Sequence, residues 1–351
     1  MRPSVLISTL VFMFLSCIYP TYEDDPFVLE ERHSIWQHLN VYSIYQERLP
    51  PELGLRTPDM LFNAINDTFC AVKYTGYADV SMKDCHSGNE GRSLNDTLFN
   101  ITDSTLYYRF SGFSDNVLNF FSSRVSYMGG HRHIIIDLRN NGGGSVGVVE
   151  EMTEEFLPFN TPYIYYRERY YNPKTRSGLT TADTMRSKNR VPQMANMKIA
   201  ILVNHNSASA SELMASALRD AAGAYIIGDT TYGKGIGQLT IRRTGRRPIR
   251  ITHMEISGIT GRTGHYHRKG LAPDTFDGQK LAEAASLFPQ DIPLGLAMRL
   301  FEPEITPEQA PEQTARLRRA AESVRSAHEA LRGERLCVGA FVELYDPLSE
   351  E

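Results

Sequence analysis

Two segments of the chain share the same order of apolar and polar positions. Residues 133–139 (HIIIDLR) and 197–203 (MKIAILV) are short runs rich in Ile and Val, which is typical of buried β-strands. A polar or glycine-rich turn follows each run, and apolar residues at helical spacing follow each turn. After the second turn these helical positions are Leu213, Met214, Ala217, Leu218 and Ala221, with Gly223 placed to end the helix. Two strand-turn-helix segments are therefore predicted.

Ser209 lies at the second of these corners, where the helix pattern begins. A serine hydroxyl is a weak nucleophile, so chemistry at Ser209 requires a neighbour that removes its proton. Lys234 follows 25 positions later in a loop flanked by glycines, and it could act as that base only when neutral. The alternative is that the serines of this run simply cap the helix.

The first corner contains three consecutive glycines, Gly142, Gly143 and Gly144. Glycine lets a backbone approach a ligand closely, and the start of the following helix offers unpaired N–H groups. The loop is thus a candidate second donor to an oxyanion formed beside Ser209. The alternative is a turn between strand and helix that binds nothing.

Four motifs in order resemble one family. DLRNNGGG, VNHNSASASE, GDTTYGKGIGQ and KGLAPD look like the C-terminal processing proteases, also called tail-specific proteases. The resemblance covers roughly residues 106–300, including DIPLGLA at 291–297. It implies an α/β fold with a crotonase-like (ClpP/crotonase-type) catalytic core, an N-terminal helical region and a C-terminal helix.

The resemblance also implies a serine-type peptidase that needs no metal or organic cofactor. Carried over by position, Ser209 is the nucleophile, Lys234 the general base and Gln238 the residue that orients the lysine. The oxyanion hole would combine the backbone N–H groups of Ala210 and Gly143. Burial away from water could lower the pKa of a lysine by several units and leave it neutral at pH 7.

Several alternatives stay open for these roles. Gly142 or Gly144 could donate to the oxyanion in place of Gly143. A histidine could be the base, as in the usual serine triad, and His205 and His253 are on or near the motif segments.

Two other kinds of site are disfavoured by the residues. GDTTYGK at 228–234 matches the first seven positions of a phosphate-binding loop, but Gly235 replaces the Ser or Thr that binds magnesium. The following GQLTIRRT alternates like a strand, where that motif should open a helix. The pairs His131 and His133, and His265 and His267, could suggest metal, but no Cys or carboxylate at ligand spacing completes either site.

Length and composition agree with one main domain and accessory parts. The chain has 351 residues, of which 41% are hydrophobic, and a formal net charge of −4, which suggests no special affinity for nucleic acid. We expect a signal at 1–22, an N-terminal helical region and linker at 23–103, a catalytic domain at 104–304 and a helical extension at 305–351.

The N-terminus predicts export. Residues 5–18 form an apolar stretch that is short for a membrane span, and a polar EDD follows at 23–25. This is typical of a secretory signal, which would bring the protein to the periplasm or the envelope. Lipid anchoring at Cys17 and a retained, uncleaved anchor are the alternatives.

The main departure from the family lies before the catalytic motifs. Many members insert a peptide-binding PDZ domain there, but only 28 residues separate Tyr77 from Leu106, too few for such a domain. We therefore expect a member without PDZ, whose polypeptide substrates are not selected by their tails through that domain. A non-catalytic ligand- or peptide-binding module on the same fold is the other functional reading, and the oligomeric state stays open.

Overall fold

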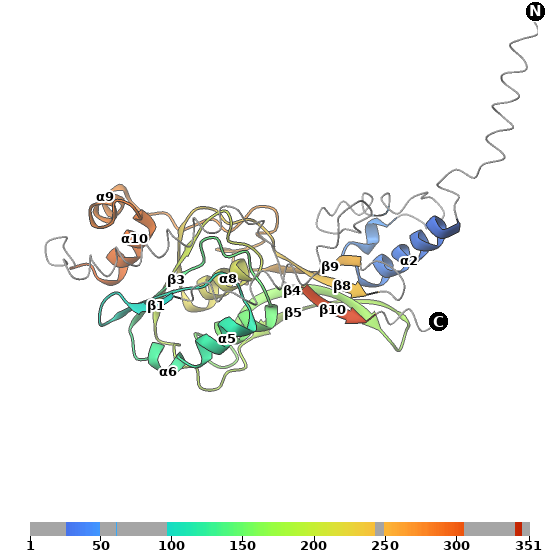
Figure 1. Ribbon diagram of the computed structural model, residues 1–351, viewed down its shortest axis with the longest axis horizontal. Coiled ribbons are helices and arrows are strands. Elements are labelled where there is room, and N and C mark those ends of the chain that lie inside the picture. Colours follow the sequence, from blue (N-terminus) through green and yellow to red (C-terminus); the bar gives the residue numbers. More distant parts are fainter. Residues whose placement is uncertain (1–25, 50–60, 62–96, 243–248, 305–340, 346–351) are drawn as a thin grey trace, which may run out of the picture.

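The structure, a computed structural model, describes residues 26–49, 61, 97–242, 249–304 and 341–345 (Figure 1). Its centre is a five-stranded sheet with the order β1-β2-β3-β6-β7. The strands β2, β3, β6 and β7 are parallel, and β1 pairs antiparallel with β2 at the edge. Their bounds are Thr97–Asn100 (β1), Thr105–Arg109 (β2), His133–Asp137 (β3), Lys198–Val203 (β6) and Tyr225–Gly228 (β7).

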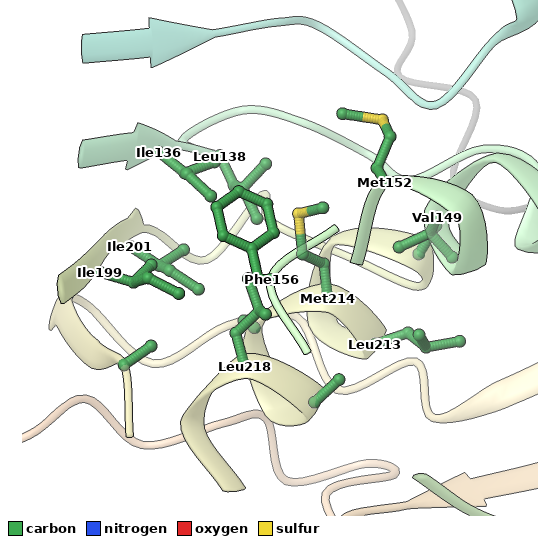
Figure 2. Packing of buried hydrophobic residues seen from close by; sticks show 14 of the residues in the cluster. Ile136, Leu138, Val149, Met152, Phe156, Ile199, Ile201, Leu213, Met214 and Leu218 are labelled. Carbon is green, nitrogen blue, oxygen red and sulfur yellow. The ribbon is translucent and has the colours of Figure 1, made fainter. Parts of the chain in front are cut away.

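Helices cover both faces of this sheet, because its strands are apolar at successive positions. Ile134 and Ile136 of β3 belong to the core beneath the helices α5, α7 and α8, whereas Ile135 faces the core beneath α9 and α10. Figure 2 shows part of the first core, where Ile136, Ile201 and Met214 surround Phe156. The helices are Asp115–Ser122 (α5), Val125–Met128 (α6), Val146–Glu154 (α7), Ala210–Ala222 (α8), Gly278–Leu287 (α9) and Ile292–Phe301 (α10).

A second five-stranded sheet has the order β10-β8-β9-β4-β5. The helix α2 (Pro26–Tyr42), followed by the short helix η2 (Gln46–Arg48), packs Ile35 and Leu39 against Ile249 and Ile251 of this sheet. The strand β10 is parallel to β8 and contributes the last described segment of the chain. The bounds are Pro162–Asn172 (β4), Ser177–Arg186 (β5), Ile236–Arg242 (β8), Ile249–Ser257 (β9) and Phe341–Tyr345 (β10).

The expected strand-turn-helix segments are present, and the mixed α/β class is confirmed. Gly223 ends α8 with φ 70°, the left-handed cap expected there. Residues 341–345 were expected to belong to a helical extension, but they form the strand β10. The signal region 1–22 with Cys17, most of the linker up to residue 96 and most of the predicted helical extension at 305–351 lie outside the described residues. Within the described part of the chain, no helix is long and apolar enough to cross a membrane.

A buried ion-pair network joins the end of β3 to the start of α10. Arg139 donates to Asp137 (2.6 Å) and to Asp291 (2.8 Å), and Asp291 also caps α10 through the N–H of Leu294. Burial alone would raise the pKa of Asp137, but the charge and hydrogen bonds of Arg139 outweigh it and hold this pKa below its ordinary value. The DLR and DIPLGLA motifs are thus parts of one contact.

This network predicts a large stability effect. Asp137→Asn removes the buried negative charge that faces Arg139, so we expect a loss of about 3 kcal/mol in the free energy of unfolding, measured by urea denaturation at pH 7. The matched control Glu255→Gln breaks the more exposed pair with Arg167 and should cost less than about 1 kcal/mol. Because the folded pKa of Asp137 is depressed, its contribution is complete above about pH 4 and is lost as the pH falls through that pKa. Equal losses for the two variants would contradict this.

Candidate active site

Three adjacent parallel strands bring the predicted site residues to one edge of the central sheet. The glycine loop follows β3, Ser209 follows β6, and the loop with Lys234 follows β7. Ligands of open α/β sheets bind at the carboxyl ends of the strands, so this edge is the physically expected place for a site. Residues far apart in sequence are thereby brought together.

Ser209 lies at the corner between β6 and α8 in a strained backbone conformation. Its φ is 57° and its ψ −114°, values that cost a residue with a side chain about 1–3 kcal/mol. A strained serine between a strand and a helix is also how α/β hydrolases present their nucleophile. A role as a helix cap would explain why a serine occupies this position, but it would not explain the strained backbone of Ser209.

The two neighbouring serines of the SASAS run have structural roles. The hydroxyl of Ser207 donates to the carbonyl of Leu138 (2.8 Å), and that of Ser211 donates to the carbonyl of Asn141 (2.8 Å). Both bonds tie the Ser209 corner to the loop after β3. The geometry therefore favours the middle serine as the reacting one.

Glu212 holds this corner and the lysine loop together. Its Oε2 accepts the N–H of Ser209 (2.9 Å) and the N–H of Lys234 (2.7 Å), while its Oε1 accepts the N–H of Gly233 (2.7 Å). Oε1 also accepts the hydroxyl of Thr231 (2.5 Å). Burial raises the pKa of Glu212, and these four hydrogen bonds oppose that shift. A fully buried carboxylate thus sets the backbones of Ser209 and Lys234 relative to each other.

Lys234 and Gln238 are both buried. Their residues are 2% and 3% exposed, and Gln238 lies on β8, four positions after the lysine. The main chain of Gln238 pairs with Thr252 of β9 and with Phe341 of β10, so these two strands hold Gln238 from both sides.

Gly143 lies directly against the Ser209 corner. With φ 103°, a Cβ there would lie 2.9 Å from the Ser209 Cβ and 3.0 Å from the nitrogen of Ala210, so only glycine fits. Its N–H donates to Oδ1 of Asn141 (2.9 Å). In this conformation the N–H of Gly143 is therefore already engaged, and it could bind an oxyanion only by sharing or releasing that bond.

The two histidines considered as alternative general bases, His205 and His253, differ in burial. His205 is exposed in the turn before α8. His253 lies on β9 next to Gly237, and burial lowers its pKa to about 4. In the described part of the chain, neither histidine is hydrogen-bonded to Ser209.

The described residues do not support a phosphate-binding loop or a metal site. The chain after Lys234 continues into strand β8, whereas a phosphate-binding loop opens a helix. The rings of His265 and His267 are 6.3 Å apart. Among the residues that the structure describes, no three His, Cys, Asp or Glu side chains are grouped to hold a metal ion.

Sequence reasoning missed Glu212 and Thr231. Glu212 stands three residues after Ser209, the spacing at which a glutamate reaches back to the N–H of a helix cap, and that signal could have found it. No comparable pattern marks Thr231. Its partners Glu212 and Leu271 lie 19 and 40 positions away in the sequence.

The mixed α/β core brings a strained serine and a buried lysine to the same edge of the central sheet. Residues 104–276 match the model of peptidase family S41. This confirms the family expected from the four motifs.

Curated relatives agree with the family. The chain is 30% identical over 191 residues to a probable CtpA-like serine protease of Staphylococcus haemolyticus, a match that covers 54% of this chain and 36% of the relative. It is 36% identical over 146 residues to the protein of the same name from Staphylococcus epidermidis, covering 41% of this chain and 27% of the relative. The match thus spans about a third of the length of these relatives.

One solved structure shows a similar fold over most of the chain. A lipoprotein from Streptococcus agalactiae has a TM-score of 0.53 with 15% identity, and the match covers 82% of this chain and 99% of that one. At this identity the likeness concerns the fold alone.

Proposed function

We propose that the protein is an exported serine endopeptidase that hydrolyses peptide bonds in protein substrates through Ser209 and Lys234. The observation that carries this proposal is the strained Ser209 corner, joined through buried Glu212 to the backbone of a buried lysine. The names of the staphylococcal relatives, probable CtpA-like serine proteases, support the same activity.

The proposed chemistry has two steps. Lys234, neutral in the free enzyme, takes the proton of the Ser209 hydroxyl as its oxygen attacks the scissile carbonyl. It then delivers this proton to the leaving amine, and water hydrolyses the acyl-enzyme with Lys234 again as base. Gln238 orients the lysine.

The charge that develops on the carbonyl oxygen needs donors. We assign them to the N–H of Ala210, at the start of α8, and to that of Gly143 once it is shared with or released from Asn141. One such donor is worth about 3 kcal/mol in a comparable hydrolase. Gly142 and Gly144 remain the alternatives in the same loop.

The cellular setting is part of the proposal. The apolar stretch at 5–18 supports export to the periplasm or envelope. Lipid anchoring at Cys17 is the alternative, and mass spectrometry of the mature N-terminus would distinguish the two. The short segment between Tyr77 and Leu106 supports a member without PDZ. Substrate choice would then rest on the catalytic domain itself.

Hydrolysis of an unfolded protein by the wild type and by Ser209→Ala tests the proposal. We expect the wild type to release peptides and Ser209→Ala to fall to background, with the same thermal unfolding midpoint within a few degrees. Ser211→Ala is the matched control, and it should keep most of the activity at some cost in stability. Equal and negligible rates for the wild type and Ser209→Ala would favour the non-catalytic binding module instead.

A further inference from the structure

Thr231 connects the lysine loop with the later KGLAPD motif. It precedes Lys234 by three positions and is 5% exposed. Its hydroxyl donates to Oε1 of Glu212 (2.5 Å) and accepts the N–H of Leu271 (2.7 Å), while its own N–H donates to the carbonyl of Leu271 (3.2 Å). We propose that Thr231 is a positioning residue, whose hydroxyl fixes the carboxylate that places Ser209 and Lys234 for the reaction proposed above.

The direction of the hydroxyl is determined by its two partners. A threonine hydroxyl has one hydrogen and two lone pairs, and the N–H of Leu271 occupies one of those lone pairs. The hydrogen is thereby aimed at Glu212, which as a carboxylate can only accept. Hydrogen bonds to a charged group are stronger than neutral ones, so this contact fixes the carboxylate firmly.

The orientation of Glu212 matters because its two oxygens serve different residues. Oε1 accepts from Thr231 and Gly233, and Oε2 from Ser209 and Lys234. The last torsion of a glutamate side chain is broad, so a carboxylate without the Thr231 bond can rotate. Rotation would shift the backbones of the nucleophile and of the base together, and a displacement of about 1 Å can cost a hundredfold in rate.

The loop around residues 266–271 makes further contacts with the lysine loop. The N–H of Arg268 donates to the carbonyl of Gly233 (2.7 Å). A Cβ at Gly270 would lie 2.3 Å from the carbonyl oxygen of Thr231, so the two loops are in direct contact. The KGLAPD motif therefore packs against the lysine loop. The hydroxyl of Thr231 connects this motif to Glu212, because it accepts the N–H of Leu271 and donates to the carboxylate.

Steady-state kinetics of Thr231→Val and Thr231→Ser test the proposal. Valine keeps the shape of threonine without the hydroxyl, and we expect kcat to fall about tenfold to a hundredfold while KM stays within about threefold. Serine keeps the hydroxyl, so Thr231→Ser should remain within about threefold of the wild-type kcat. The matched control is Thr153→Val, because Thr153 is 0% exposed on α7 and its hydroxyl has no hydrogen-bond partner among the described residues.

Three kinetic outcomes would overturn the positioning role while leaving the proposed function intact. The first is a Thr231→Val enzyme as active as an active wild type. The second is a Thr231→Ser variant as impaired as Thr231→Val, since shape and not the hydroxyl would then matter. The third is a raised KM with unchanged kcat, which would indicate a binding role.

Amide hydrogen exchange tests the same link without turnover, so the test stands even if the peptidase proposal fails. Without the Thr231 hydroxyl, the N–H groups of Gly233 and Lys234 should exchange about tenfold faster in Thr231→Val, and near the wild-type rate in Thr231→Ser. Thr153→Val should leave both amides unchanged. Equal exchange in Thr231→Val and the wild type would contradict the role of Thr231.

Discussion

Replacing Lys234 with alanine will abolish peptide hydrolysis while the protein stays folded. The lysine is 2% exposed beside the Ser209 corner, and only its side chain is proposed to accept the serine proton. A general base contributes about 10²–10⁴ to a rate, so kcat should fall by about a hundredfold to ten-thousandfold once the nucleophile is no longer activated. The backbone N–H that Lys234 donates to Glu212 remains in the variant, which is why the fold should persist. The measurement is the initial rate on an unfolded protein substrate, with circular dichroism as the check on folding.

Three variants separate the role of the lysine from its charge and from nearby groups. Lys234→Arg should be as inactive as Lys234→Ala, because a guanidinium stays protonated and cannot act as a base. Lys269→Ala removes an exposed lysine of the neighbouring loop and should leave the rate unchanged. His253→Gln tests the histidine alternative and should keep the activity. Turnover retained in Lys234→Ala but lost in His253→Gln would make the histidine the base.

Glu212→Gln will lower kcat by about a hundredfold. Glutamine keeps the size of the side chain, but its amide group donates where one carboxylate oxygen accepted two hydrogen bonds. Either the pair from Ser209 and Lys234 or the pair from Thr231 and Gly233 then loses its acceptor. Each buried donor left unsatisfied costs about 1–3 kcal/mol, so we also expect a loss of about 3 kcal/mol in the free energy of unfolding. Steady-state kinetics and urea denaturation of the same preparation measure both effects.

Glu154→Gln is the matched control for this variant. Glu154 is also a buried glutamate that accepts backbone N–H groups, from Lys188 (2.7 Å) and Asn189 (3.2 Å), but it lies on α7 and makes no contact with the lysine loop through these bonds. Its substitution should lower stability and leave kcat unchanged. If Glu212→Gln keeps the wild-type kcat, the carboxylate does not position the site.

The sequence predicted the parts of the site that depend on local pattern. The strand before Ser209, the helix after it and the glycine that ends that helix follow from apolar periodicity and from the conformational freedom of glycine. The strand after Gly235 was also visible as alternation, and it correctly argued against a phosphate-binding loop. Four motifs in order then indicated the family.

The contacts that assemble the site could not be found in this way, because they join residues that only the fold brings together. Arg139 meets Asp291 across 152 positions, and Thr231 meets Leu271 across 40. The bond from Gly143 to Asn141 is local, yet its consequence for the oxyanion donor depends on where the loop lies against Ser209. Lys234 is likewise buried in a fold where its backbone N–H meets Glu212, 22 positions earlier in the sequence.

The identity of the acylated residue tests the central claim most directly. A peptide p-nitrophenyl ester, mixed with the wild type and quenched in acid within the first turnover, should leave an acyl group that mass spectrometry of the digested protein locates. The prediction is an adduct on Ser209 in the wild type and none in Ser209→Ala. An adduct on Ser207 or Ser211, or turnover with no acyl-enzyme and full activity in Ser209→Ala, would contradict it.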